Sequence, residues 1–431
     1  NMELDRPQRV MLFKFCAYGF LKNLRFFEPF LYLFFLAKGL SYTQIGILIG
    51  VQAITVYVLE IPTGIIADLT GRRRAMVLAF ASYLVSFAIF SATSSFWLFA
   101  VAMVLFGAGE AFRSGTHKSM IMQHLDIEGL SDLKVHYYGT TRSVSRLGSA
   151  ASILIAGTIV YLSGGYHLVF AASMVPYVFG LLLMLTYPAE LDGQWSKRSS
   201  AGSMVRHMVD SFKTIRANRE LDKLLVNGAV FESFFKVAKD YLQPILKQAA
   251  LALPVLAAIG VKKGGEAAVL ITPVYFAIYI NEFVSSRWSG RLADRVGNLA
   301  KSLNWLFWAL AGGFVLAGVF LKLSLMPVTV VLVFVFYTLN NLRKPAVIGF
   351  LSDQVEPKQR ATILSVEAQT IAIVQAAVAP LLGLIADRLS IPYVFIIGGA
   401  VLVAAGVPLQ LGRSSRERTA EAASAVPKEE P

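Results

Sequence analysis

The feature that most constrains the fold is an internal repeat with a separation of 226 residues. A Gly-x-x-x-Asp-x-x-Gly pattern at residues 64–71 returns at residues 290–297. The same separation relates the basic pair at 117–118 to the pair at 343–344. A separation held at several places indicates a duplicated half. Both copies run in the same direction, which predicts two parallel bundles related by an axis along a membrane normal.

The chain is too apolar for a soluble protein of its length. Its mean hydropathy is +0.60, and 56% of its residues are hydrophobic. A membrane-spanning helix needs about 20 mostly apolar residues. We therefore predict an all-α polytopic membrane protein with twelve transmembrane helices in two parallel, pseudo-symmetric six-helix bundles. The predicted spans lie near residues 12–37, 42–67, 75–94, 96–120, 137–161, 166–187, 222–247, 267–288, 301–321, 327–351, 361–385 and 391–411.

The sequence lacks the usual signals of enzymes and metal proteins. We expect no cleavable signal peptide, because the first apolar stretch is a full span without a small-residue cleavage site. The lone Cys16 excludes an internal disulfide and a cysteine metal cluster. The five histidines have no metal-ligand spacing. Neither a Walker-type glycine loop nor a nucleophile elbow is present. We expect no cofactor, no metal and no enzymatic activity.

The net charge of +13 could suggest a nucleic-acid partner, but the distribution of the charge favours a membrane. An even number of spans leaves both termini on one side, and placing them inside puts most loop Lys and Arg inside as well. The basic residues then serve topology and contacts with lipid headgroups. We predict a multi-pass protein of the cell inner membrane with both termini cytoplasmic, monomeric, and without a nucleic-acid partner.

The predicted organisation has four parts. Residues 1–188 form the N-terminal bundle and residues 222–412 the C-terminal bundle. A cytoplasmic linker at 189–221 contains an amphipathic helix that we expect on the inner membrane surface. The tail at 413–431 is polar and rich in Ala, Glu and Ser, and we expect it to be disordered.

Charged residues divide the predicted spans into two sets. Spans 3, 6, 9 and 12 carry no charge between their ends. Charges facing lipid are costly, so the charged spans should face a central cavity and the other four should lie outside. In span seven, Glu232, Lys236, Lys239, Asp240 and Gln243 share one helical face. In span one, Lys22, Arg25, Glu28 and Tyr32 follow a similar face.

Basic residues outnumber acidic ones on the cavity-facing spans. This excess predicts a small anionic or zwitterionic organic solute, because the planar guanidinium group suits a carboxylate or phosphate. Alternatives remain: Arg25 with Glu28, Glu110 with Arg113, and Lys236 with Asp240 could be fixed ion pairs. The candidate substrate-binding residues are Arg25, Arg113, Arg146, Lys236, Lys239, Asn340, Asn341 and Arg343.

Coupling to a proton gradient requires a carboxylate that both sides can reach in turn. Glu28 is the first candidate because it lies near mid-depth, and Glu110 and Asp240 follow. Glu367 lies nearer the inner face and fits a gate better. Sodium is an alternative coupling ion.

Taken together, these features resemble the major facilitator superfamily over roughly residues 10 to 412. The specific motif is the loop between spans two and three, which matches the family pattern. The resemblance implies a gate at the inner side, formed by this loop and, more weakly, by its second copy. The candidate gating residues are Gly64, Asp68, Gly71, Arg72, Arg73, Gly290, Asp294 and Glu367. The Gly-Pro motif of drug/proton antiporters is absent near Arg146, and the sugar-porter signature is absent after Pro188.

These observations predict a secondary active transporter of a small anionic or zwitterionic solute, proton-coupled and working by alternating access. One alternative is a drug or amphiphile exporter or a lysophospholipid flippase, which the aromatic residues Phe26, Phe27, Phe30, Phe234 and Phe235 would suit. An alternative from another class is a membrane sensor or scaffold, although the chain carries no recognisable output domain.

Overall fold

The computed structural model describes residues 5–192, 218–255, 261–262, 264–295, 299–354 and 360–412. These residues are mostly helical and contain no strand, which confirms the all-α prediction. Each predicted span coincides with at least one helix, although residues 12–37 and 96–120 each cover more than one. Eight helical stretches of the described chain are long and apolar enough to cross a membrane. Glu28–Ala37 and Ile391–Gly406 are shorter apolar helices.

The chain forms two compact units. Unit 1 comprises residues 1–200 and 243–276, and unit 2 comprises residues 201–242 and 277–431. Residues 243–276, which the sequence division assigns to the second bundle, thus belong to unit 1. There the Lys262 ammonium group donates to the Leu162 carbonyl at 3.1 Å, and Lys247 lies over the Tyr166 ring. The amphipathic helix predicted in the linker and the tail at 413–431 lie outside the described residues.

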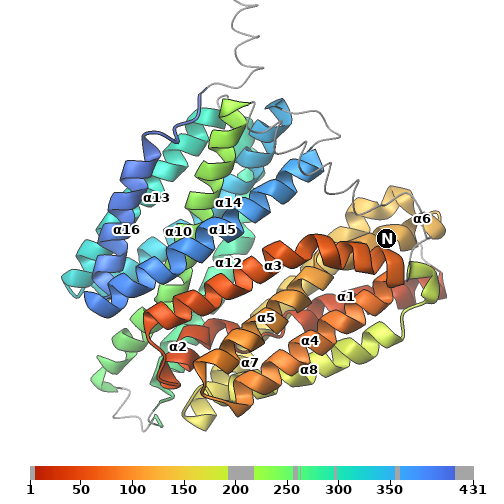
Figure 1. Cartoon of the computed structure of the whole chain (residues 1–431), viewed down its shortest axis with the longest axis horizontal. Helices are drawn as coiled ribbons and strands as arrows, with labels where there is room; N and C mark the ends of the chain where they lie inside the picture. Colours follow the sequence, from red (N-terminus) through yellow and green to blue (C-terminus); the bar gives the residue numbers. More distant parts are fainter. Residues whose placement is uncertain are drawn as a thin grey trace, which may run out of the picture. The chain divides into compact units, whose positions relative to one another are not determined.

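Unit 1 is built mainly from the first half of the chain (Figure 1). In it, α4 packs along α5 and α8, α3 packs along α5, and α1 packs along α7. Its elements are α1 (Arg6–Lys22), η1 (Glu28–Phe30), α2 (Leu31–Ala37), α3 (Tyr42–Thr70), α4 (Arg72–Ala92), α5 (Phe96–Arg113), α6 (Thr116–Ile127), η2 (Ser131–Leu133), α7 (Lys134–Ser163), α8 (Leu168–Leu185) and η3 (Ala189–Asp192).

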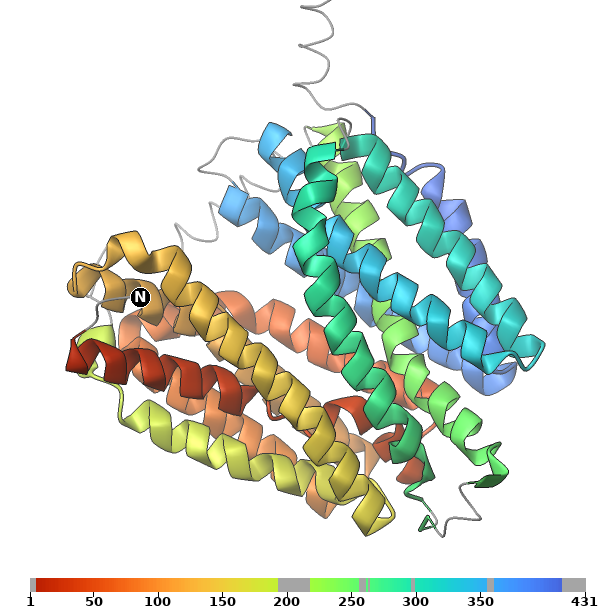
Figure 2. The ribbon, with the colours of Figure 1, turned by 180° about the vertical axis from the view of Figure 1, so that it is seen from behind.

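Unit 2 holds most of the second half, which is seen from the other side in Figure 2. Within it, α13 packs along both α14 and α16, and α15 contacts α16. The last part of α10 and the first part of α12 belong to unit 1. The helices of the second half are α10 (Arg219–Leu251), α12 (Glu266–Arg295), α13 (Leu299–Lys322), α14 (Met326–Gln354), α15 (Arg360–Arg388) and α16 (Ile391–Gly406).

Aromatic side chains form much of the core of unit 1. Phe170 of α8 stacks on Phe27 with ring centroids 4.7 Å apart, and on Phe90 of α4 at 4.5 Å. Phe87 and Phe106 continue this packing toward α5. Large flat side chains bury a large apolar area and fix their neighbours through offset and edge contacts. This core holds α4, α5 and α8 around the segment that follows α1.

The first predicted span is broken. The α-helix ends at Lys22 and resumes only at Leu31, after η1. Pro29 in η1 lacks a backbone N–H and disfavours a continuous helix. The four polar residues predicted on one helical face of this span therefore do not lie on a continuous helix, which corrects that expectation. By contrast, α10 runs as one helix through Pro244.

The break is stabilised by side chains that bind its open backbone groups. Gln243 is central: its Oε1 accepts from the Tyr32 backbone N–H at 2.8 Å, and its Nε2 donates to the Glu28 carbonyl at 3.1 Å. The Ser173 hydroxyl accepts from the Phe26 N–H at 3.0 Å. Inside a membrane, unpaired backbone groups cost several kcal/mol. Non-helical backbone is tolerated here because other elements supply the missing partners.

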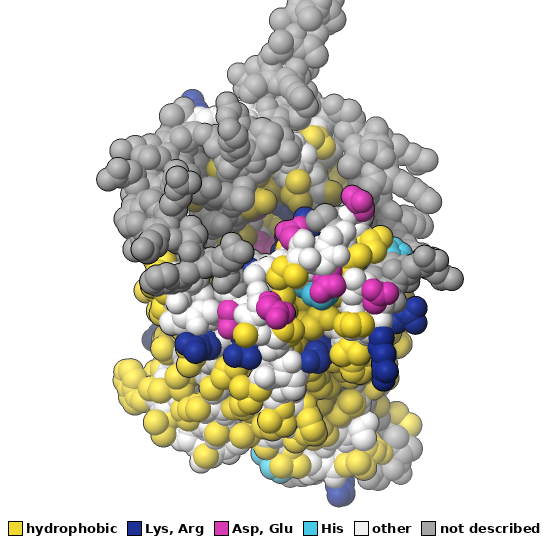
Figure 3. All heavy atoms as spheres, turned by 90° about the vertical axis from the view of Figure 1, so that its right-hand side faces the viewer, with side chains coloured by type: hydrophobic (Ala, Val, Ile, Leu, Met, Phe, Trp, Pro, Cys, Tyr) yellow, Lys and Arg dark blue, Asp and Glu magenta, His cyan; other side chains and the backbone are white. Residues whose placement is uncertain are grey.

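One face of the molecule shows how its surface is divided. The face that carries α6 and the start of α1 has a broad band of hydrophobic side chains (Figure 3). Lys and Arg side chains lie along the edge of this band, and Asp and Glu side chains gather beyond it. Apolar side chains against lipid, bordered by cations at headgroup level, would produce this pattern.

Candidate functional site

Two arginines share one carboxylate in unit 1. Arg25, in the break after α1, and Arg113, at the end of α5, both form ion pairs with Glu110. Nη2 of Arg113 lies 2.5 Å from Oε2 of Glu110. The Tyr83 hydroxyl of α4 donates to Oε1 of Glu110 at 2.6 Å. Nε of Arg25 donates to the Tyr177 hydroxyl of α8 at 2.9 Å. We call these five residues the Glu110 cluster.

The local sequence makes this arrangement possible. The break in the first span takes Arg25 out of a continuous helix, so its side chain reaches α5 and α8. Gly109 allows α4 to approach α5, since a Cβ there would lie 2.9 Å from the Tyr83 ring and 3.0 Å from the Ala79 carbonyl. The Tyr177 hydroxyl donates to the Lys22 carbonyl at 3.0 Å and fixes the end of α1.

The Glu110 cluster carries one positive charge in excess, because two guanidinium groups oppose one carboxylate. The side chains of Arg25, Arg113 and Glu110 are 20%, 21% and 17% exposed. They are therefore neither sealed in the core nor fully hydrated. A partly desolvated guanidinium with donors to spare can bind an anionic group through charge-assisted hydrogen bonds.

From the sequence, two ion pairs were possible in this region: Arg25 with Glu28, and Glu110 with Arg113. The structure shows the Glu110–Arg113 pair, and it joins Arg25 to Glu110. Tyr83 and Tyr177 were not predicted. They lie on spans 3 and 6, which carry no charge and were assigned to the outside. A search for charged residues misses hydroxyl groups on such helices, although a tyrosine within an apolar span is a usable signal.

Arg146 and Glu28 are the other candidates in unit 1. Arg146 of α7 is exposed. Glu28 is half-buried in η1, and its backbone carbonyl accepts the Gln243 hydrogen bond. Lys22 lies with its ammonium group 5.9 Å from the centre of the Tyr18 ring. The roles predicted for Arg146 and Glu28 stay predictions.

The loop between α3 and α4 is held by Asp192 of η3 and by Gln123 of α6. Gly71 has φ +103°, and a Cβ there would lie 2.8 Å from Cγ of Asp192. Asp192 accepts the backbone N–H of Arg73 at 2.7 Å. Nη1 of Arg72 donates to Oε1 of Gln123 at 2.6 Å. The glycine is thus needed both for its backbone conformation and for the close approach. Asp192 and Gln123 were not predicted.

The other gating candidates of α3 and α12 are Gly64, Asp68, Gly290 and Asp294. Gly64 is half-buried in α3, and Asp68 is exposed near the end of that helix. Gly290 and Asp294 lie in the last part of α12, where the structure does not describe side chains. A gating role for these residues therefore stays a prediction.

A buried histidine lies one turn beyond Arg113. His117 of α6 stacks on Tyr18 with ring centroids 3.6 Å apart, and its Nε2 lies 3.3 Å from the Tyr187 hydroxyl. The Tyr187 hydroxyl donates to the Lys14 carbonyl at 3.3 Å. Gly115, with φ +73°, separates α5 from α6 and positions His117.

The candidates on α10, α12 and α14 make several helix–helix contacts. Lys236 Nζ donates to Oε1 of Gln375 on α15 at 2.8 Å. Lys239 and Asp240 are half-buried on α10. The Asn341 amide donates to the Ser285 hydroxyl of α12 at 2.9 Å. Asn340, Arg343 and Glu367 are the other candidates here, and Asn340 and Arg343 are buried.

The aromatic residues that suggested an amphiphile site are occupied in packing. Phe26, Phe27 and Phe30 are at most 6% exposed, and Phe234 and Phe235 are buried as well. They therefore give no support to an apolar binding surface. Within the described residues, no group of His, Cys, Asp or Glu lies close enough together to hold a metal ion.

This bundle of apolar helices, with charged clusters held among them, defines a polytopic membrane protein of the transporter type. The sequence profile of the Major Facilitator Superfamily matches residues 11–342, and the chain belongs to that superfamily. Comparison of the sequence with curated proteins finds no match.

Solved structures of several transporters are similar to this fold. The nucleoside transporter NupG has a TM-score of 0.74 at 13% identity, covering 93% of this chain and 98% of that one. A POT family transporter in complex with 5-aminolevulinic acid has a TM-score of 0.67 at 16% identity, covering 94% and 96%. A bacterial homologue of the human lysosomal transporter Spinster has a TM-score of 0.68 at 16% identity, covering 94% and 97%. These similarities confirm the predicted twelve-helix fold.

Proposed function

We propose that the protein is a secondary active transporter of a small anionic or zwitterionic organic solute, coupled to protons and working by alternating access. The observation that carries this proposal is the charge of the Glu110 cluster. Two partly exposed guanidinium groups share one carboxylate, so one positive charge remains for a ligand. A carboxylate of the solute would compensate it, and the Tyr83 and Tyr177 hydroxyls lie within the same cluster.

A protein of the same fold has been solved with 5-aminolevulinic acid, and another is a peptide transporter. At 16% and 13% identity these likenesses concern the fold alone. A zwitterion is therefore the first kind of ligand to test.

We place the transporter in the cell inner membrane as a monomer with both termini cytoplasmic, since the basic loop residues favour that orientation. The four-part organisation of the chain, at 1–188, 189–221, 222–412 and 413–431, belongs to the same proposal. Lys236, Lys239, Asn340 and Asn341 would line the solute path on α10 and α14.

The test uses matched ligands. Purified protein is melted with 5-aminolevulinic acid, with its methyl ester, and with a panel of dicarboxylates and dipeptides, each beside its ester. We expect some free acids to raise the melting temperature and their esters, which lack the carboxylate, to fail. Arg113→Gln should abolish the stabilisation, whereas Arg142→Gln, an exposed arginine on α7, should keep it. Stabilisation by esters or cations alone would contradict the proposal.

Coupling is tested in proteoliposomes that contain a pH-sensitive dye. Adding a stabilising acid outside should acidify the lumen if a proton enters with the solute. An unchanged lumen, with uptake that requires sodium instead, would replace the proton by sodium as the coupling ion.

A further inference from the structure

Unit 2 contains a buried guanidinium group that, among the described residues, has only neutral groups at bonding distance. Arg343 of α14 is 4% exposed. Its Nη2 donates to Oδ1 of Asn227 at 2.7 Å, and its guanidinium carbon lies 4.6 Å from the centre of the Phe231 ring. Its Nη1 is buried and has no hydrogen-bond partner in the part of the chain that the structure describes. An unpaired donor on a buried cation is costly, so its persistence suggests a partner that comes and goes.

A carboxylate lies close to this guanidinium without joining it. Oε1 of Glu367 on α15 lies 3.3 Å from the point that a Cβ on Gly228 would occupy. Nη2 of Arg343 lies 3.8 Å from the same point. Both groups therefore lie beside Gly228, and Oε1 of Glu367 comes closer to it than a larger side chain would readily allow. Among the ion pairs of the described chain, none involves Arg343 or Glu367.

The charged groups that act on one another here come from three helices. They are Arg343 of α14, Glu367 of α15 and Glu232 of α10. Asn227 and Gly228, also on α10, complete the contacts of the guanidinium. We call Arg343, Asn227, Gly228 and Glu367 the Arg343 site.

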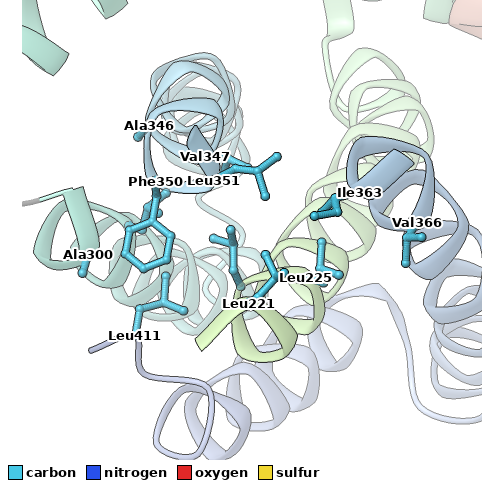
Figure 4. Packing of buried hydrophobic residues seen from close by; sticks show 12 residues of the cluster. Leu221, Leu225, Ala300, Ala346, Val347, Phe350, Leu351, Ile363, Val366 and Leu411 are labelled. Atoms are coloured by element: carbon cyan, nitrogen blue, oxygen red, sulfur yellow. The ribbon is translucent and has the colours of Figure 1, made fainter. Parts of the chain in front are cut away.

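The same helices carry a cluster of buried apolar side chains (Figure 4). Leu224 and Leu225 precede Asn227 on α10, Val347 follows Arg343 by one turn of α14, and Val366 is adjacent to Glu367. All of these apolar side chains are buried. Charges in such a poorly solvated place interact strongly, so the gain or loss of one charge at Glu367 changes what Arg343 can bind.

In the described chain, Glu110 of unit 1, unlike Glu367, is held in ion pairs. It is held by two guanidinium groups and a tyrosine hydroxyl. Adding a proton to it would leave two cations facing each other. Among the described residues Glu367 has no such ion pairs, so a proton on it does not leave two cations facing each other.

We propose that Glu367, rather than Glu110, is the proton-coupling carboxylate, and that its charge decides whether Arg343 is available to a carboxylate of the solute. This inference rests on the proposed transport function. When Glu367 is ionised, it attracts the guanidinium and competes with the solute. When Glu367 takes up a proton, Arg343 is released to form hydrogen bonds with the solute carboxylate. The proton and the anion then bind together, and the site gains no net charge.

The first experiment needs no solute. Infrared difference spectra of the protein in lipid nanodiscs are recorded between mildly alkaline and mildly acidic pH. We expect a band of a protonated carboxyl group in the wild type that disappears in Glu367→Gln and remains in Glu110→Gln. A band that persists in Glu367→Gln, or the loss of the same band in Glu110→Gln alone, would overturn the proposal. Glu367→Asp, which keeps a carboxyl group, should retain the band at a shifted position and shows that substitution at this site is tolerated.

The second experiment separates this inference from the transport proposal. Using an acid that stabilises the wild type in the melting panel, we expect Glu367→Gln to remain stabilised but to lose the acidification of the liposome lumen. Loss of both effects would assign Glu367 to solute binding and contradict its coupling role. If no acid stabilises the wild type, the transport proposal fails, while the infrared result still decides whether Glu367 exchanges a proton.

Discussion

A buried position that is equivalent in the two halves carries a different side chain in each unit. In the repeat, His117 corresponds to Arg343, and both side chains are buried. Each lies against an aromatic ring of the first helix of its half: Tyr18 for His117 and Phe231 for Arg343. In unit 1 the basic charge lies one turn earlier, at Arg113, where it is paired with Glu110. In unit 2 the charge lies at the repeated position itself and has no ion pair within the described chain.

This difference separates two kinds of charged site. The Glu110 cluster is paired and braced by tyrosines, so it presents a fixed excess of positive charge. The Arg343 site is incompletely satisfied, so its state can change with a proton or a ligand. The placement of one carboxylate relative to one guanidinium thus distinguishes the two halves.

The largest effect should come from removing the shared carboxylate. Glu110→Gln leaves Arg25 and Arg113 facing each other in a partly buried place, and losing one partner of such a pair costs about 3–5 kcal/mol. We expect a clear fall in melting temperature of the purified protein. Removing a cation as well, in Glu110→Gln with Arg113→Gln, should restore part of the loss.

Glu232→Gln serves as the matched control, because Glu232 is a half-buried acid on α10 without an ion pair in the described chain. Equal melting temperatures for Glu110→Gln and the wild type would mean that the cluster is not paired in solution, and the contrast between the units would disappear.

A smaller effect is expected at the break in the first span. Gln243→Leu removes the partner of the Tyr32 N–H and of the Glu28 carbonyl. Leaving a buried polar group without a partner costs about 1–3 kcal/mol. Gln248→Leu, at an exposed position of the same helix, should melt like the wild type. A Gln243→Leu variant that is equally stable would show that the break does not depend on this side chain.

Arg343→Gln tests how much the Arg343 site contributes to stability and to acid binding. Because this guanidinium has no ion pair among the described residues, its removal should change stability by only about 1 kcal/mol, less than Arg113→Gln. The same variant should lose stabilisation by the acids that protect the wild type. Melting curves with and without such an acid measure both effects. A loss of stability as large as that of Arg113→Gln would indicate that an acid holds Arg343 in solution.

The sequence predicted the helices and the symmetry well, since long apolar stretches and a repeated motif depend on local patterns. It did not predict which charges meet. Helical spacing places Arg25 and Glu28 on one face, but Pro29 breaks the helix, and Arg25 binds Glu110 instead. Gln243 was predicted on the polar face of its helix, yet its role at the break depends on a partner about 200 residues away. Contacts between distant helices are fixed by packing, which one sequence does not display.

The smallest effect should come from an ion pair with similar geometry in a different environment. Lys134 Nζ lies 2.7 Å from Oδ1 of Asp126, almost as close as the Glu110–Arg113 pair, but the two side chains are 38% and 57% exposed. Exposed pairs contribute about 0–1 kcal/mol because water and salt screen the charges. Lys134→Gln should therefore hardly change the melting temperature, and the little it does change should vanish at high salt. If it destabilised the protein as much as Glu110→Gln, exposure would not be what separates strong from weak pairs in this molecule.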